Sequence, residues 1–501
     1  MEETTQLIVK PGDHGDVCNE HDGSSRLNFQ NSFDCFGASI RIISVALSES
    51  MTGIDFLGSM AIAVNSLTGP AMLCLPATYQ RSGLIPTTAV IIFTCILSAL
   101  CCLQMSNTIS KVPNNQNFGF DIGYSECFRR FGGPKSYNVT QVLFFCCITC
   151  LNVSSIVDTA QVVDTFFGHW VPYGSLAINF QFINGQFSVD LIKWDYNTCS
   201  EEMLVSGECI PYSGVEGILF TIGYAITLLT FLPMAVTDFK ENAAMQIFGF
   251  LVLLVSSVGF VVPFLLEGIN LDNASLWGTE WRSLFGVVLF NFALVIAIPA
   301  WLYEKDPHVN VPAVVYGSSL LTTILYMSIG IVGAITMPHA SQNMLESLLS
   351  GVYGTAMQLC ASIFAYVIIG LGCPLFSILA RMNLTDGNGL LSRDAANWLA
   401  VYLPFGSSWI FYQGDAIYQL LSCGGIIFTS LVAFILPLLL SLHTLKTVTD
   451  EGSVDVYKPF HVKSKKGKKM AIRLLLGLAN ASIVLAIIGN LPFMNSKLFN
   501  Q

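Results

Sequence analysis

The chain has 501 residues, of which 53% are hydrophobic and only 11% are charged. Ordinary soluble domains carry about 25% charged residues. This composition, with a mean hydropathy of +0.62, excludes a soluble globular protein and a disordered one, and it indicates a chain embedded in a membrane. The net charge of −10 identifies no partner, because the distribution of charge in a membrane protein matters more than its sum.

Residues 1–50 are polar and acidic, and we predict a largely disordered cytosolic tail there. No cationic segment with a cleavage site precedes the first apolar run, so that run acts as an uncleaved signal. Glu3, separated by three residues from Leu7-Ile8, has the acidic dileucine form by which adaptor proteins sort endosomal, lysosomal or vacuolar cargo. Chance matches to this form are frequent.

Eleven long apolar runs follow within residues 51–493, which we predict to be one transporter-like membrane domain. Each run is expected to be a membrane-spanning helix, which makes the protein an all-α polytopic membrane protein. A short non-cytosolic tail, 494–501, ends the chain. The runs cover residues 54–79, 84–107, 137–163, 214–236, 243–266, 284–303, 311–335, 352–379, 395–411, 417–443 and 470–493.

The first run is interrupted in its middle by the segment 65–70, which reads Asn-Ser-Leu-Thr-Gly-Pro. Gly and Pro side by side disturb helical geometry and remove a hydrogen bond. Lipid cannot satisfy the freed N–H and C=O groups, so a break of this kind persists only where it lines a cavity or a bound solute. The first span is therefore a candidate solute site.

The sixth run contains a similar interruption, with Asn291 and Pro299 inside one apolar segment. An ordinary proline kink, which membrane helices tolerate, explains Pro299 when it is taken alone. Breaks in spans one and six together fit a five-plus-five inverted repeat, in which a solute binds at the midplane between the two halves.

The chemistry of such a site follows from the ends of the half-helices. The half-helix after Gly69 presents free N–H groups and a positive dipole end to a carboxylate, whereas carbonyls released at 65–68 accept an ammonium group. A zwitterionic amino acid matches both features better than a sugar does. The predicted substrate-binding residues are Asn65, Ser66, Leu67, Thr68, Gly69, Ala71, Asn291, Phe292, Ala293 and Leu294.

Several loose motifs occur in a fixed order between residues 54 and 493. They are Asn65-x-x-x-Gly69 with Met72-Leu73-x-Leu75-Pro76 and Gly83, Tyr124-Ser125 with Phe131-Gly132, Ser155-x-x-Asp158-x-x-Gln161, Pro299-x-Trp301 with Glu304-Lys305, and Pro374-Leu375-Phe376 with Arg381-x-Asn383-Leu384. In this order they resemble the amino acid/auxin permease family. That family has the broken-helix fold of the bacterial leucine transporter and belongs to the amino acid–polyamine–organocation superfamily.

The resemblance also bears on the coupling ion. In sodium-driven members of the family, the Asn that matches Asn65 and a hydroxyl residue in span eight help to hold the ion. This chain has Gly370, Gly372 and Cys373 in that stretch, and a sodium site needs several oxygen ligands. We expect coupling to H+, or facilitated exchange, rather than coupling to Na+. Asp158 in span three is the candidate proton carrier; the alternative places it at the outer interface.

Charge places the N-terminus in the cytosol and the C-terminus outside. Only Arg81, Lys193, Arg282 and Lys497 fall in non-cytosolic segments, and the other nineteen of the 23 Lys and Arg residues are on the cytosolic side. The exterior gap 164–213 holds Cys199 and Cys209, which either form a disulfide or remain free thiols. Asn273 heads an exterior glycosylation sequon.

We therefore predict a secondary transporter for amino acids, with neutral ones as the expected substrates, in the plasma membrane or a vacuolar or endolysosomal membrane. The alternative is an amino acid-sensing receptor of the same fold with little transport. Phosphate-binding, metalloprotease and hydrolase motifs are missing from the sequence, so no enzyme, cofactor or metal is expected. The expected partners are the amino acid, H+ and membrane lipid, with no nucleic acid.

Overall fold

The structure is a computed structural model. It describes residues 53–68, 70–183, 186–196, 211–212, 214–215, 217–281, 284–338, 340, 344–349, 351, 353–385, 391–412, 427–447 and 464–490. The predictions for both tails, with the Glu3, Leu7 and Ile8 segment, lie outside the described residues. So do those for Gly69, Cys199 and Cys209.

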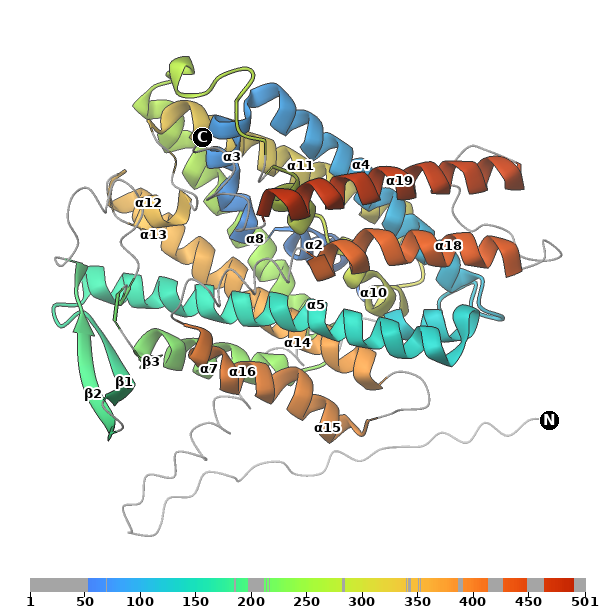
Figure 1. Ribbon diagram of the computed structural model, residues 1–501, viewed down its shortest axis with the longest axis horizontal. Coiled ribbons are helices and arrows are strands. Elements are labelled where there is room, and N and C mark those ends of the chain that lie inside the picture. The colour runs from blue at the N-terminus through green and yellow to red at the C-terminus, as the bar shows by residue number, and fades with distance from the viewer. Residues whose placement is uncertain are drawn as a thin grey trace, which may run out of the picture.

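Most of the described chain is helical, and long apolar helices run side by side along one direction (Figure 1). In the described ranges, eight helices are long and apolar enough to cross a membrane. The chain is therefore a multi-pass membrane protein. These helices are Leu84–Ser110 (α4), Tyr124–Trp170 (α5), Phe239–Glu267 (α8), Leu284–Glu304 (α9 to α10), Val311–Thr336 (α11), Thr355–Thr385 (α13 to α14), Ile427–Thr447 (ending in α18) and Lys465–Ile488 (in α19, Lys465–Asn490).

A broken pair of helices forms the first predicted span. α2 (Phe56–Leu67) begins at Asp55, whose carboxylate accepts a hydrogen bond from the Gly58 N–H at 2.7 Å. A short 3-10 turn (Pro70–Cys74) then leads into α3 (Leu75–Ser82). The two halves are bent by 52°. Counted as one span, this pair brings the membrane-crossing helices of the described part to nine.

The sixth predicted span is also interrupted, as expected. α9 (Leu284–Asn291) ends in the middle of the segment, a 3-10 turn covers Leu294–Ile296, and α10 (Ile298–Glu304) completes it. Pro299 lies in the first turn of α10. Backbone N–H groups in the first turn have no acceptor within the helix, so a proline there breaks no helical hydrogen bond. The proline therefore starts a half-helix and does not merely kink a continuous one.

One predicted span, the fourth, is shorter than expected, and another, the ninth, is irregular. The run 214–236 was expected to be helical throughout, but Ile218–Thr221 forms strand β3 and the helix α7 covers only Ile222–Ala235. The Thr221 hydroxyl accepts from the Tyr224 N–H at 3.1 Å, and this cap sets the start of α7. The ninth run is helical from Arg393 to Phe411 through α15, a π-helical stretch, α16 and a 3-10 turn.

A small antiparallel sheet, absent from the all-α prediction, lies at one end of the helices. β1 (Ser175–Ile183) is the central strand between β2 (Gln186–Trp194) and β3 (Ile218–Thr221). Figure 1 shows β1 and β2 running across the direction of α5, just beyond its C-terminal end. The sheet therefore belongs to the extramembrane gap that follows the third span.

The two broken spans are held by intact helices on either side. α11 packs against α2, α3 and α4, and α8 packs against α2, α11 and α13 (Thr355–Phe364). On the other side, α5 packs against α7 and α14 (Gly370–Thr385). Large buried aromatic residues fill this interior, including Tyr79, Tyr326, Phe292 and Phe364. The broken segments are thus enclosed by protein, as buried irregular backbone requires.

Candidate functional site

A cavity lies where the two broken spans meet helices α5 and α14. The space open to the centre of a water-sized sphere is about 50 Å³. One water needs at least about 10–15 Å³ on this measure, so several waters or a small solute can enter. None of the lining residues is charged. They are Asn65, Ser66, Leu67, Thr68, Leu151, Ser154, Ser155, Phe290, Asn291, Ala293, Ile296, Ala297, Ile368, Ile369, Gly372, Phe376 and Leu379.

Both half-helices that precede a break end at this cavity. α2 ends at Leu67 and α9 ends at Asn291, and both residues belong to the lining. The last carbonyls of a helix have no partner within the helix and form the negative end of its dipole. Two such ends therefore direct partial negative charge toward one small, uncharged space.

Tyr326 of α11 contacts both of these helix ends. Its hydroxyl donates a hydrogen bond to the Leu67 carbonyl, and it lies 3.4 Å from the Asn291 carbonyl. The Tyr326 side chain is fully buried, and its ring packs edge-on against Phe292 at 5.5 Å. Because a hydroxyl group has one proton, it can donate a full hydrogen bond to only one carbonyl at a time. Tyr326 is therefore a shared cap for the two breaks.

Asn65 is held by a polar network beneath the first break. Its amide nitrogen donates to the backbone carbonyl and the side-chain oxygen of Gln246, at 2.8 and 2.9 Å. Gln246 in turn donates to the Asn242 side chain and the Leu371 carbonyl, at 2.9 and 3.2 Å. This orientation leaves the Asn65 amide oxygen buried with no hydrogen-bond partner in the protein.

Asn291 is arranged in the same way at the second break. Its amide nitrogen donates to the Val287 carbonyl one turn earlier at 3.1 Å, and its amide oxygen is buried without a partner. Buried polar atoms are seldom left unpaired. Two residues that line one cavity each carry an unpaired amide oxygen. This indicates that a hydrogen-bond donor from outside the protein, such as an ammonium group or water, binds to these oxygens.

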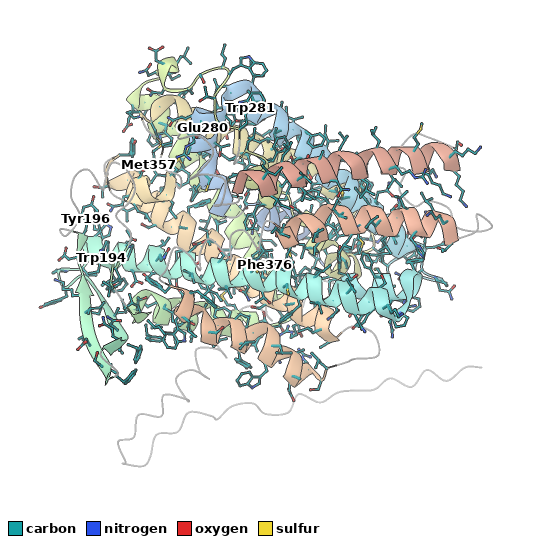
Figure 2. The ribbon with its side chains drawn as sticks, viewed as in Figure 1. Trp194, Tyr196, Glu280, Trp281, Met357 and Phe376 are labelled. Atoms are coloured by element: carbon teal, nitrogen blue, oxygen red, sulfur yellow. The ribbon has the colours of Figure 1, made fainter. Side chains whose placement is uncertain are left out.

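Spans three and eight supply the remaining wall. Ser154 and Ser155 come from α5, and Ser154 lies 3.4 Å from the half-buried carboxylate of Asp158 one turn further along. A π-helical stretch (Ala365–Ile369) precedes α14 and places Ile368 and Ile369 in the lining. π-Bulges of this kind are frequent at functional sites. Figure 2 labels Phe376, which is also in this lining and lies near the middle of the bundle.

The structure brings together most of the predicted substrate residues but not all of them. Asn65, Ser66, Leu67, Thr68, Asn291 and Ala293 line the cavity. Phe292 and Leu294 are buried outside this lining. The Phe292 carbonyl accepts from the Ser98 hydroxyl at 2.8 Å, so this residue anchors the break to α4. Ala71 lies in the 3-10 turn after the first break.

Both outer ends of the broken spans are tied down by main-chain hydrogen bonds. At the start of α2, the Ile54 N–H donates to the Glu304 carbonyl at 2.8 Å, and the Asp306 N–H donates to Ile54 at 2.9 Å. At the end of α3, the Gly278 N–H donates to the Ser82 carbonyl at 3.0 Å. The broken first span is thus tied to neighbouring segments at both of its outer ends.

The glycosylation site and the disulfide that we predicted at the membrane exterior stay predictions. Asn273 lies between α8 and α9, and its amide nitrogen is 3.2 and 3.4 Å from the Ile335 and Thr336 carbonyls. No disulfide joins the ten cysteines of the described residues; the predicted Cys199–Cys209 bridge falls outside these residues.

Sequence reasoning missed a second buried acid, Asp164 in α5. Its carboxylate accepts from the Ser175 hydroxyl at 2.5 Å, the Tyr412 hydroxyl at 2.6 Å and the Gly223 N–H at 2.9 Å. These partners come from β1, from the end of the helical segment 393–411 and from α7. Asp164 therefore anchors the sheet to the helices, and it is not among the cavity-lining residues.

No family model matches this sequence, and no curated protein matches it either. Membership of the amino acid/auxin permease family therefore stays a prediction that rests on the ordered motifs and on the two broken spans.

Proposed function

We propose that the protein is a secondary active transporter that moves neutral amino acids across a membrane by alternating access. One observation carries the proposal: the carbonyl ends of two broken membrane helices meet at an uncharged cavity, and its lining includes Asn65 and Asn291, whose buried amide oxygens have no partner in the protein. Broken helices whose ends converge in mid-bundle are typical of carriers that bind their solute there.

The composition of the cavity supports a zwitterion as substrate. The unpaired oxygens of Asn65 and Asn291 and the carbonyl end of α9 accept an ammonium group. The N–H groups at the start of the second half-helices are suited to a carboxylate. The rest of the wall is mostly apolar, including Leu151, Ile368 and Phe376. A charged side chain would be costly there without a partner, so we infer a neutral one.

We further propose eleven spans in a five-plus-five inverted repeat, with the N-terminus cytosolic and the C-terminus outside. The nine membrane-crossing helices of the described part are joined in this scheme by α7 and the helical segment 393–411. The breaks then fall in the first helix of each half. The bias of Lys and Arg toward one side supports this orientation, and a plasma or vacuolar membrane is the proposed location.

Proton coupling is favoured over sodium coupling. The span-eight part of the cavity wall consists of Ile368, Ile369, Gly372, Phe376 and Leu379, none of which has a hydroxyl group. The proposed proton carrier is Asp158, which reaches the cavity wall through Ser154. The span-eight side chains of this wall therefore offer no oxygen ligand to a sodium ion, which needs several.

The test is uptake of radiolabelled amino acids into proteoliposomes, with a competition panel at acidic and neutral pH and with or without sodium. Gly69→Val should abolish uptake because it fills the first break. Asn291→Leu should lower affinity by about tenfold or more, because a hydrogen bond to a charged group contributes about 1.5–3 kcal/mol.

Asn480→Leu is the matched control for Asn291→Leu. Asn480 in α19 also donates to the carbonyl four residues earlier, Leu476, at 2.8 Å, but it is exposed and outside the cavity lining. Equal loss in both variants would contradict the site. Amino acid binding without flux in the wild-type protein would replace the carrier with a receptor of the same fold.

A further inference from the structure

The extramembrane sheet has two faces of different character. Side chains alternate along a strand, and Ala177, Asn179 and Leu219 on one face are buried in the protein. The opposite face exposes large apolar side chains in the described strands. These are Leu176, Ile178, Phe187, Val189, Leu191 and Ile218, of which Leu191 is 72% and Phe187 60% exposed.

The strand register places these residues on one continuous surface. Ile178 pairs with Leu191 and with Phe220, and Phe180 pairs with Val189 and with Ile218. Residues paired directly across an antiparallel ladder share a face. We call the six exposed residues of the preceding paragraph the apolar sheet face.

The side of the sheet that carries the apolar sheet face contacts the end of a helix of the membrane domain. The rings of Phe180 and Phe220 pack on Trp409, at 5.8 and 6.2 Å between centroids. Trp409 lies in the last turn of the segment Arg393–Phe411, which exposes Trp398, Tyr402, Leu403 and Ile410 along its side. Trp409 thus joins the sheet to a helical segment that also exposes apolar side chains.

The direction and attachment of the strands fit the plane of a bilayer. A bilayer surface lies across the spanning helices, and β1 and β2 run across α5 at its end (Figure 1). The hydrogen bonds of Asp164 to Ser175 and Gly223 fix the sheet to α5 and α7. Figure 2 labels Trp194, which is at this end of the molecule and whose ring lies against Tyr212 on the buried side.

The residues around the apolar sheet face are those typical of a membrane interface. Trp170 and Tyr173, at the end of α5, are 43% and 77% exposed, and Trp and Tyr are enriched at the level of lipid headgroups. Lys193 pairs with Leu176 in the register and forms an ion pair with Asp195 at 3.3 Å. A lysine stem can lie on apolar surface while its ammonium group reaches phosphate.

We propose that the β1–β2 hairpin lies flat on the outer surface of the bilayer, with the apolar sheet face buried among phospholipid headgroups and upper acyl chains. The contact with Trp409 favours lipid as the occupant. A sheet face that adjoins the lipid-facing surface of a helix is exposed to the same lipid as that helix. The hairpin then holds the extramembrane end of α5 and α7 at a set depth in the membrane.

Photo-crosslinking of the full-length protein in phosphatidylcholine vesicles with tritiated acyl chains tests this proposal. A benzophenone amino acid is placed at position 191, or at position 190 of the opposite sheet face as the matched control. Position 255 is the positive control, because Val255 is 71% exposed on the membrane helix α8. Tritium incorporation at 191 should approach that at 255 and exceed that at 190 severalfold.

Three results would overturn the proposal. Equal incorporation at 190 and 191 would mean that the sheet contacts lipid non-specifically, and label at 255 without label at 191 would mean that the face is in water. A crosslink from 191 to residues 197–210 or 413–426, or to a second copy of the chain, would identify a protein occupant instead. None of these results depends on whether the protein transports amino acids.

Discussion

At the scale of single residues, the hydroxyl of Tyr326 connects the two broken helices. It donates to Leu67 at the end of α2 and lies close to the Asn291 carbonyl at the end of α9. Alternating access requires bundles that move relative to one another around a fixed site. A hydroxyl that caps one break while facing the carbonyl of the other can exchange between them as the helices move.

Tyr326→Phe tests this residue because it removes the hydroxyl and leaves the ring in place against Phe292. The Leu67 carbonyl then loses its partner in a buried place, which costs about 1–3 kcal/mol. We expect a lower apparent melting temperature in detergent and a lower maximal uptake rate.

The control is Tyr316→Phe in the same helix, α11, where the side chain is 48% exposed. That variant should behave as wild type in both measurements. If Tyr326→Phe keeps wild-type stability and uptake, the shared cap has no role.

At the scale of elements, the start of α2 and the end of α10 are joined by two main-chain hydrogen bonds around Ile54. Gly53 makes this contact possible, because a Cβ added there would lie 2.7 Å from the Asp306 nitrogen. The contact lies at the end that we assign to the cytosol, and we propose that it closes that end of the broken spans.

Gly53→Val should therefore break the contact and open that end. Hydrogen–deuterium exchange should become faster in peptides covering 53–60 and 304–309, since the Ile54 and Asp306 N–H groups lose their acceptors. Exchange in α4 should not change.

Gly119→Val is the matched control, since a Cβ at Gly119 meets no atom within 4 Å. Gly119 follows Phe118, whose ring lies 5.7 Å from the Lys305 ammonium. The control substitution therefore lies at the same end of the molecule as Gly53. Faster exchange in the control as well would point to general loosening and not to a broken closure.

At the scale of the whole molecule, the orientation in the membrane is open to a direct test. Asn273 lies in the gap that we place outside, and glycan transfer occurs only on that side. The protein expressed in a eukaryotic membrane should show a glycosidase-sensitive mobility shift that Asn273→Gln removes.

Asn138→Gln is the internal control, because Asn138 is exposed but lies in a stretch assigned to the cytosol. It should leave the shift unchanged. A glycan on Asn138 and none on Asn273 would invert the proposed topology.

The sequence predicted the parts of the fold that follow from local chemistry. Gly69-Pro70 and Pro299 indicated where two spans break, because neither residue type supports a regular helix in lipid. Asn65 and Asn291 were recognised as polar residues in apolar runs. The start of the fourth span was placed too early, since the β-branched and aromatic residues of Ile218–Thr221 are apolar in a helix and in a strand alike.

Other parts of the site depend on contacts between distant segments. Tyr326 and Gln246 carry no local signal, because each is one of several polar residues in its helix and its partners lie far away in the chain. The wall formed by Ile368, Ile369 and Gly372 depends on a π-helical stretch that shifts their direction. Asp164 acquires its role only because β1, α7 and Tyr412 converge on it.

The sequence by itself determined that this chain lies in a membrane, where its helices run and where two of them break. Hydrophobicity and the limits of Gly and Pro are properties of neighbouring residues, so they can be read along the chain. The tertiary structure decided that the two breaks lie at one uncharged cavity and that an apolar sheet face adjoins one end of the helices. Those features arise from packing between segments far apart in sequence, which no local pattern encodes.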